Sequence, residues 1–279
     1  MPDTPPCKLG VMIPELGMQD GGRALRYLLL HQNTLQKSFE FHVLPVIEDR
    51  IVDQLLPGQR ANRIQVEEEM PAFMRKCREN YARLAQGYGL PSEPDPILIL
   101  STATFADNYY LTGGDDWGII ALGNWERHMA PPSIVEFFLS FAVKVAIDKA
   151  CGDQFPQRHI MTKGCSFDFH ADIANARYSV LSGWLCAQCI NTISLAHSDQ
   201  LVNDAQLLLK REWLGTVAEP SDVSITAKKL GYDLFHVKGI TPTWWERIRT
   251  VLEEEGVKML LTIIAGLTVL ALSIYWGLK

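Results

Sequence analysis

The sequence predicts an α/β (α+β) domain with a cysteine-rich zinc-binding segment and a single C-terminal transmembrane helix. Three observations lead to this fold class. Strand-like and helix-like segments alternate over residues 1–150, which is typical of helices packed on a sheet. Four of the six cysteines lie within residues 151–193, and residues 259–278 carry no charged side chain.

The first two strands and the helix between them are predicted from hydropathy. Residues 8–14 form an apolar run closed by Pro14, which predicts a strand. Residues 22–35 carry leucines at helical spacing and predict an amphipathic helix. Residues 39–46 alternate apolar and polar side chains, the pattern of a second strand.

The next segments predict one helix and two strands. Residues 66–87 repeat apolar side chains every three or four positions and predict a helix. Residues 97–101 follow a proline-rich loop and form a short apolar run, which predicts a buried strand. Residues 117–122 predict another strand, introduced by a glycine-rich turn at residues 113–116.

A long helix is predicted at residues 134–149, after two prolines that are tolerated in a first helical turn. It is apolar nearly all round, so we expect it in the centre of the domain. Beyond the cysteines, residues 201–213 predict a helix, and a shorter helix runs from the N-cap candidate Ser221 to Gly231.

The C-terminal segment predicts a membrane anchor. At about 1.5 Å per residue, residues 259–278 are long enough to cross a hydrocarbon layer of about 30 Å. Tyr275 and Trp276 lie near one end, where aromatic rings favour the headgroup region. Lys and Arg are in excess before this segment and the N-terminus has no signal-peptide pattern, so we expect a cytosolic body and an outside C-terminus. The tryptophans of residues 241–258 are expected either on the bilayer surface or packed on the domain.

These features divide the chain into five predicted parts. They are the α/β domain (1–150), the zinc-binding segment (151–193), a small helical extension (194–240), an amphipathic juxtamembrane helix (241–258) and the transmembrane helix (259–278).

The charge balance excludes one class of partner. The net charge is −6 and the pI about 5.7, whereas nucleic-acid-binding proteins carry an excess of Lys and Arg. Hydrophobic residues make up 47% of the chain, enough to build a packed core. Nucleic acid is therefore not a predicted partner. The predicted partners are the lipid bilayer, from the C-terminal segment, and either another protein or further copies of the chain.

The cysteines predict a structural zinc site. Cys186 and Cys189 form a Cys-x-x-Cys pair that can hold one tetrahedral Zn²⁺, and Cys165 supplies a third thiolate. For the fourth ligand we favour His159, with Cys151 as the alternative and His170 as a poorer third. A reducing compartment favours metal over a disulfide. The rival interpretations are a thioredoxin-like redox pair and buried free thiols.

The cysteine segment also carries a family resemblance. The runs from Cys165 to Ile173 and from Trp184 to Cys189 resemble the zinc-cluster segment that ends archaemetzincins. Residues 41–45 resemble an early strand of that family, and residues 97–101 and 117–122 resemble the two strands before its catalytic helix. The resemblance covers roughly residues 8–192 and implies a metzincin-like domain.

The chain departs from that family at the catalytic helix. The family's His-Glu-x-x-His motif holds a catalytic zinc ion, and it occurs nowhere in this chain. Val135 and Leu139 stand where the two histidines belong, and Glu136 stands where the general base belongs. Glu136 is thus a weak catalytic candidate, and a carboxylate paired with an arginine is the simpler interpretation. We therefore expect a pseudoenzyme.

Together these features predict a tail-anchored interaction, sensor or effector module. The analogy is with bacterial stress and phage-defence systems. One alternative is a membrane-bound zinc hydrolase that uses Glu136 with His128, His159 or His170. Another is an oligomeric, membrane-disrupting or pore-forming effector.

Overall fold

The computed structural model describes residues 5–18, 21–88, 96–126, 129–152 and 164–235, together with Ile248. The chain divides into two compact units, Met1–Ile240 and Thr241–Lys279. All described residues except Ile248 belong to the first unit, so the elements and contacts that follow are those of the first unit.

The described residues in the first half of this unit form seven strands and three helices. In chain order they are β1 (Cys7–Met12), α1 (Gly21–Leu35), β2 (Phe39–Leu44), α2 (Arg50–Gln54), β3 (Arg60–Ala61), α3 (Arg63–Tyr88), β4 (Ile97–Ser101), β5 (Thr104–Phe105), β6 (Leu111–Gly113) and β7 (Trp117–Ala121). The second half is helical, with α4 (Ile134–Cys151), α5 (Ile173–Ser182), α6 (Ala187–Ala196), α7 (Asp199–Lys210), the 3₁₀ turn η3 (Glu212–Leu214) and α8 (Asp222–Lys229).

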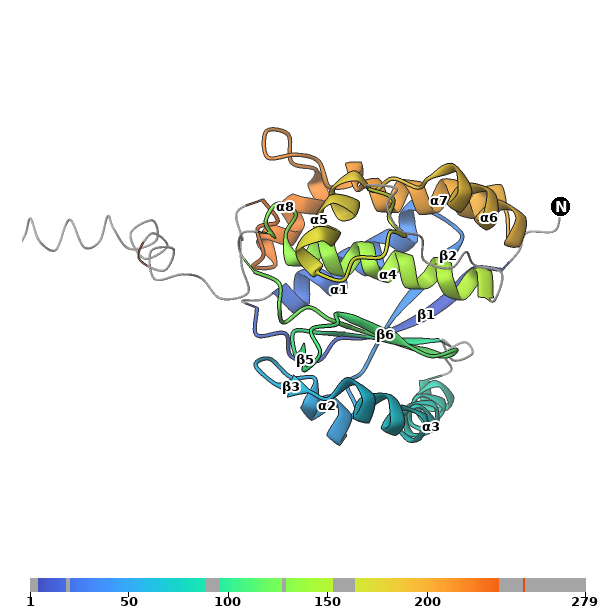
Figure 1. Cartoon of the computed structure of the whole chain (residues 1–279), viewed down its shortest axis with the longest axis vertical. Coiled ribbons are helices and arrows are strands. Elements are labelled where there is room, and N and C mark those ends of the chain that lie inside the picture. The colour runs from blue at the N-terminus through green and yellow to red at the C-terminus, as the bar shows by residue number, and fades with distance from the viewer. Residues whose placement is uncertain are drawn as a thin grey trace, which may run out of the picture. The chain divides into compact units, whose positions relative to one another are not determined.

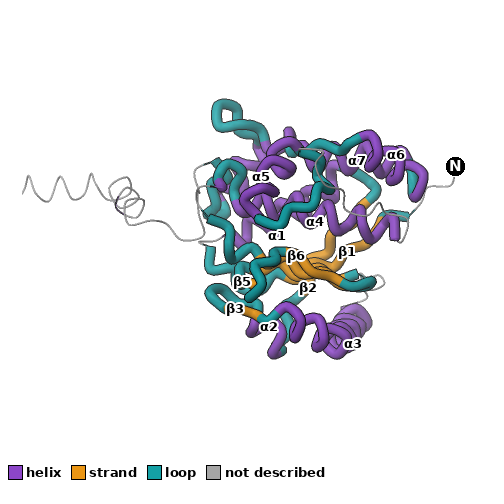
Figure 2. Tube along the Cα trace, in the orientation of Figure 1, coloured by secondary structure: helices purple, strands orange, loops and turns teal. Residues whose placement is uncertain are grey.

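Five of the strands form one twisted sheet in the order β2-β1-β4-β7-β6. Four of them are parallel, and the edge strand β6 pairs antiparallel with β7. Helices α1 and α4 cover one face of the sheet, and α2 and α3 cover the other (Figure 1). Helices α5, α6 and α7 pack on α4 and form an additional layer, seen above the strands in Figure 2.

The core lies on both faces of the sheet. Along β4, Leu98 and Leu100 pack with α1 and α4, whereas Ile97 and Ile99 pack with α2 and α3. Successive side chains of a strand point to opposite faces, so a strand covered on both faces is apolar throughout. Helix α4 lies between the sheet and the outer helices, which explains why it is apolar nearly all round.

The strands and helices predicted for the first half are present with small shifts at their ends, but other elements were not predicted. Helices α2, α5 and α6 and strands β3, β5 and β6 are new. Strand β6 has only three residues, too few to show an alternating pattern. Helices α5 and α6 lie in the cysteine segment and begin at capping side chains, those of Asp172 and Cys186.

The predicted fold class is wrong in its membrane-spanning part. The structure is a mixed α/β fold with a cysteine cluster, and within the described ranges no helix has both the length and the apolar character needed to cross a bilayer. The tail anchor and the single-pass membrane location are thus not supported. Residues 241–258 and 259–278, to which those predictions referred, lie outside the described residues apart from Ile248.

Candidate metal centre

Three of the predicted ligands come together in the structure. Cys165, Cys186 and Cys189 are buried, and their Sγ atoms all lie within 4.8 Å of one another. The Cys165 and Cys189 sulfur atoms are 3.8 Å apart. Two thiolates bound at about 2.3 Å to one tetrahedral zinc ion lie about 3.8 Å apart, so this pair already has the spacing of metal ligands.

Two short segments bring the sulfur atoms to this position. Cys165 opens a tight turn in which the Asp168 amide donates to the Cys165 carbonyl at 3.0 Å. The neighbouring Ser166 amide donates to the Trp184 carbonyl at 2.7 Å, which holds the turn beside the chain that leads into α6. Cys186 caps the N-terminus of α6, so Cys189 lies in the first turn of that helix, on the same side of the helix as Cys186.

Backbone amides surround the sulfur atoms. The amides of Phe167 and Cys186 donate to the Cys165 sulfur at 3.5 and 3.4 Å, and the Cys189 amide donates to the Cys186 sulfur at 3.5 Å. Hydrogen bonds and the positive end of a helix both stabilise a thiolate relative to a thiol. These amides therefore offset part of the cost of forming thiolates, the form of cysteine that binds metal.

Without a cation, this arrangement resists ionisation. The pKa of the Cys189 thiol is raised, first by its hydrogen bond with the Cys165 thiol, then by burial and by the nearby Cys186 sulfur. A divalent ion reverses this effect because it replaces the protons and neutralises the clustered thiolates. All six cysteines, each of which lies in the described part of the chain, are thiols and not disulfides.

Of the other predicted ligands, Cys151 and His170 are described by the structure and do not belong to this group of sulfur atoms. His159 and His128 lie outside the described residues. Cys151 is buried at the end of α4, where burial, Asp148 and the neighbouring Cys7 raise its pKa to about 11. The pKa of His170 is lowered by burial and by Lys144, and its ring nitrogens are not within the 4.8 Å cluster.

Glu136 takes part in a helix cap and in an ion pair. Its carboxylate accepts from the Ser133 amide at 2.7 Å, and its own amide donates to the Ser133 hydroxyl, so the two residues form a capping box at the start of α4. The other carboxylate oxygen lies 3.5 Å from Nε of the buried Arg211. Val135 and Leu139 have no exposed surface and belong to the core.

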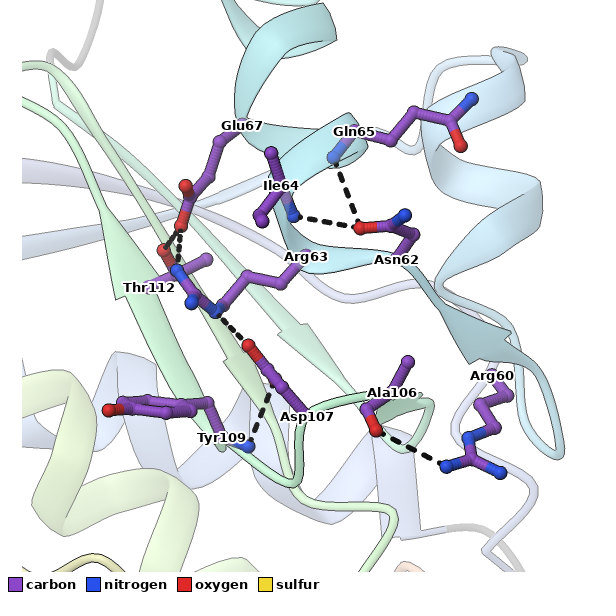
Figure 3. Close-up of polar contacts among 10 residues, drawn as sticks. All are labelled: Arg60, Asn62, Arg63, Ile64, Gln65, Glu67, Ala106, Asp107, Tyr109 and Thr112. Carbon is purple, nitrogen blue, oxygen red and sulfur yellow. Dashed lines mark hydrogen bonds and ion pairs between the residues drawn. The ribbon is translucent and has the colours of Figure 1, made fainter.

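A polar cluster around Arg63 was not predicted from the sequence (Figure 3). Arg63 Nε donates to Asp107 at 2.7 Å and Nη1 donates to Glu67 at 2.6 Å, while the guanidinium lies 4.8 Å from the centre of the Tyr109 ring. Thr112 on β6 also donates to the Glu67 carboxylate. The two carboxylates raise the pKa of Arg63. The cluster fastens the start of α3 to the loop before β6, and no spacing motif signals these long-range contacts.

A scan against protein-family models gives no match, and searches of curated proteins and of solved structures give none either. The fold and the site therefore define the class: a mixed α/β domain in which three buried thiols lie close enough to hold one metal ion. The resemblance to archaemetzincins stays a prediction.

Proposed function

We propose that Cys165, Cys186 and Cys189 hold one Zn²⁺ as a structural centre, and that the domain is a non-catalytic module that acts by binding another protein. The observation that carries the metal assignment is the convergence of three buried thiols at metal-ligand spacing. Thiolate ligands in a tetrahedral arrangement favour zinc among the common divalent ions.

The metal has a clear structural task in this fold. Helices α5 and α6 have 10 residues each, and isolated helices shorter than about 12–15 residues are marginal in water. The zinc ion would link the turn after Gly164 to the first turn of α6, and α5 lies between these two points in the chain. Metal binding would thus supply cohesion that the short helices lack.

The surroundings of Glu136 support the non-catalytic part of the proposal. A general base needs a free carboxylate beside activated water. One carboxylate oxygen of Glu136 accepts a hydrogen bond from the Ser133 amide, and the other forms an ion pair with Arg211. The flanking Val135 and Leu139 are core side chains without metal-binding atoms. For the zinc ion we propose His159 as fourth ligand, which would close the coordination shell and leave no position for a reacting water.

The test is elemental analysis of the purified full-length chain. We expect one zinc ion per chain that resists a mild chelator, and loss of that zinc in Cys186→Ser and in Cys189→Ser. Cys77→Ser is the matched control, because Cys77 is equally buried but lies on α3, outside the cluster. Zinc retained by both cluster variants would overturn the metal assignment. A second, labile zinc ion would contradict the non-catalytic assignment.

The proposed fourth ligand needs its own variant. His159→Ala should weaken zinc binding without abolishing it, since three thiolates remain. An unchanged zinc affinity in this variant would remove His159 from the ligand set and leave the three-sulfur site in place.

A further inference from the structure

Strand β2 is an edge of the sheet, and its backbone groups alternate between two directions. The Cys7 amide on β1 donates to the Ser38 carbonyl at 2.8 Å, so the even-numbered residues of β2 direct their backbone groups toward β1. Phe39, Phe41 and Val43 therefore direct theirs outward. Such a row of outward N–H and C=O groups is a template for pairing with another chain.

Two side chains bind these outward backbone groups, those of Asn33 in the last turn of α1 and of Gln36 directly after the helix. The Asn33 amide group donates to the Phe41 carbonyl at 2.9 Å and accepts from the Phe41 amide at 2.8 Å. The Gln36 amide group does the same for Phe39, at 2.9 and 2.8 Å. Each side-chain amide thus makes the two hydrogen bonds that a residue of a neighbouring strand would make.

The rest of this edge has few backbone groups available for pairing with another strand. Pro45, directly after the strand, has no N–H to donate. The outward N–H and C=O groups of Val43 lie between Phe41 and Pro45. The opposite edge of the sheet, β6, is only three residues long, and short edge strands are another way to limit pairing.

The edge of β2 is complementary to itself. In an antiparallel pair of two copies centred on Phe41, the Glu40 side chain of one copy lies opposite His42 of the other, and Phe39 lies opposite Val43. Within one copy Glu40 Oε1 and His42 Nε2 are already 3.2 Å apart, so these groups form an ion pair when the imidazole is protonated. Opposite charges and apolar pairs across strands favour pairing.

We infer that the β2 edge is a latent self-pairing surface for a second copy of this chain, and that the amides of Asn33 and Gln36 keep it closed. The inference does not depend on the zinc centre, which lies on other elements. It means that a neighbouring strand has to displace these two side chains before it can form its own hydrogen bonds at Phe39 and Phe41.

The test is site-specific crosslinking in the full-length chain. Residues 40 and 42 of two antiparallel copies would form a non-hydrogen-bonded pair with Cα atoms about 4.5 Å apart, within the range that a disulfide spans. Glu40→Cys and His42→Cys are introduced together, once with the edge closed and once with Asn33→Leu and Gln36→Met, which keep side-chain volume but remove the amides. Under mild oxidation we expect at least about a tenfold increase in covalent dimer with the opened edge.

The closed-edge protein is the matched control, since it carries the same six natural cysteines. Equal crosslinking of the two proteins would overturn the inference, provided that the opened-edge protein has native circular dichroism. If the double replacement does not fold, Asn33→Leu alone opens the central Phe41 pair and decides the matter, because Asn33 is only half-buried.

Charge provides a second readout. In the opened-edge protein with Glu40 and His42 retained, sedimentation should show a molar mass approaching twice the 31.4 kDa of one chain. Adding His42→Glu places carboxylates opposite each other and should return the mass toward that of the closed-edge parent. A dimer that persists in this variant would contradict the antiparallel register.

Discussion

Gly183 ends α5 and permits its close approach to α7, and its replacement by alanine should destabilise the domain severely. Its φ is 56° and its ψ 23°, the left-handed conformation. An added Cβ would lie 2.2 Å from the Leu209 carbonyl oxygen and 2.7 Å from Lys210 Cα. These are backbone atoms of α7 and its end, so no side-chain rotation can relieve the overlap.

The size of the effect has two parts. The left-handed conformation costs a non-glycine residue about 1–2 kcal/mol. Overpacking against rigid neighbours costs about 1–3 kcal/mol more. Gly183→Ala should therefore lower the free energy of unfolding by about 2–5 kcal/mol, measured by urea denaturation followed by circular dichroism.

Gly58→Ala separates the two parts. Gly58 also has a positive φ, 78°, but an added Cβ there meets no atom within 4 Å. This variant should show only the backbone cost of about 1–2 kcal/mol. Equal losses of stability in the two variants would refute the argument that close packing of α5 on α7 requires Gly183.

Three further predictions concern the buried arginine, a histidine and the metal. Arg211→Met should lower the free energy of unfolding by about 3–5 kcal/mol, because it leaves Glu136 without its cation; a loss below about 1 kcal/mol in urea denaturation would contradict this. Burial lowers the pKa of His31, so the folded state binds fewer protons than the unfolded state and stability should fall as the pH drops below about 6.5. A smaller fall in His31→Phe, measured as the urea midpoint at pH 7 and pH 5, checks this assignment. Chelation should lower the unfolding free energy of the zinc-loaded chain, by about 4 kcal/mol when the starting free zinc is 1,000 times Kd, and should leave Cys189→Ser unchanged.

The hydrophobic pattern of the first half was sufficient to predict most of its elements. Strands β4 and β7 are covered on both faces, so their sequences are continuous apolar runs that are easy to recognise. The cysteine spacing likewise predicted that Cys186 and Cys189 lie together, because a Cys-x-x-Cys pair is a local feature. Cys165 joins them from a segment 21 residues earlier in the chain. The membrane-spanning helix was predicted from a long uncharged apolar run with aromatic residues near one end, and the described helices do not support it.

Other features depend on contacts between distant parts of the chain and left no local signal. Arg211 is buried in a left-handed conformation, with φ of 56°, where a sequence-based prediction expects glycine or asparagine. Its guanidinium donates to Ser140 on α4 at 2.6 Å and to the carbonyl of Leu209 at 2.8 Å. The Asn33 and Gln36 amides that cover β2 likewise show no sequence pattern that distinguishes them from exposed helix residues.

The contacts of Arg211 lead to a final prediction about the metal centre. Its guanidinium also donates to the Val180 carbonyl on α5, and the chain continues from there through Gly183 to Trp184, whose carbonyl holds the Cys165 turn. Arg211 and the proposed zinc ion thus restrain the same short segment, one at α5 and the other just beyond it. Perturbations that act on a shared element are not additive, typically by about 0.5–3 kcal/mol.

A double-mutant cycle measures this coupling. Arg211→Met, Cys189→Ser and their combination should give a combined loss of stability smaller than the sum of the single losses, because a segment released by the first change has less order to lose to the second. Cys77→Ser combined with Arg211→Met is the control and should be additive, since Cys77 lies on the opposite face of the sheet. Additivity in both pairs would mean that the metal centre and Arg211 stabilise separate parts of the helical layer.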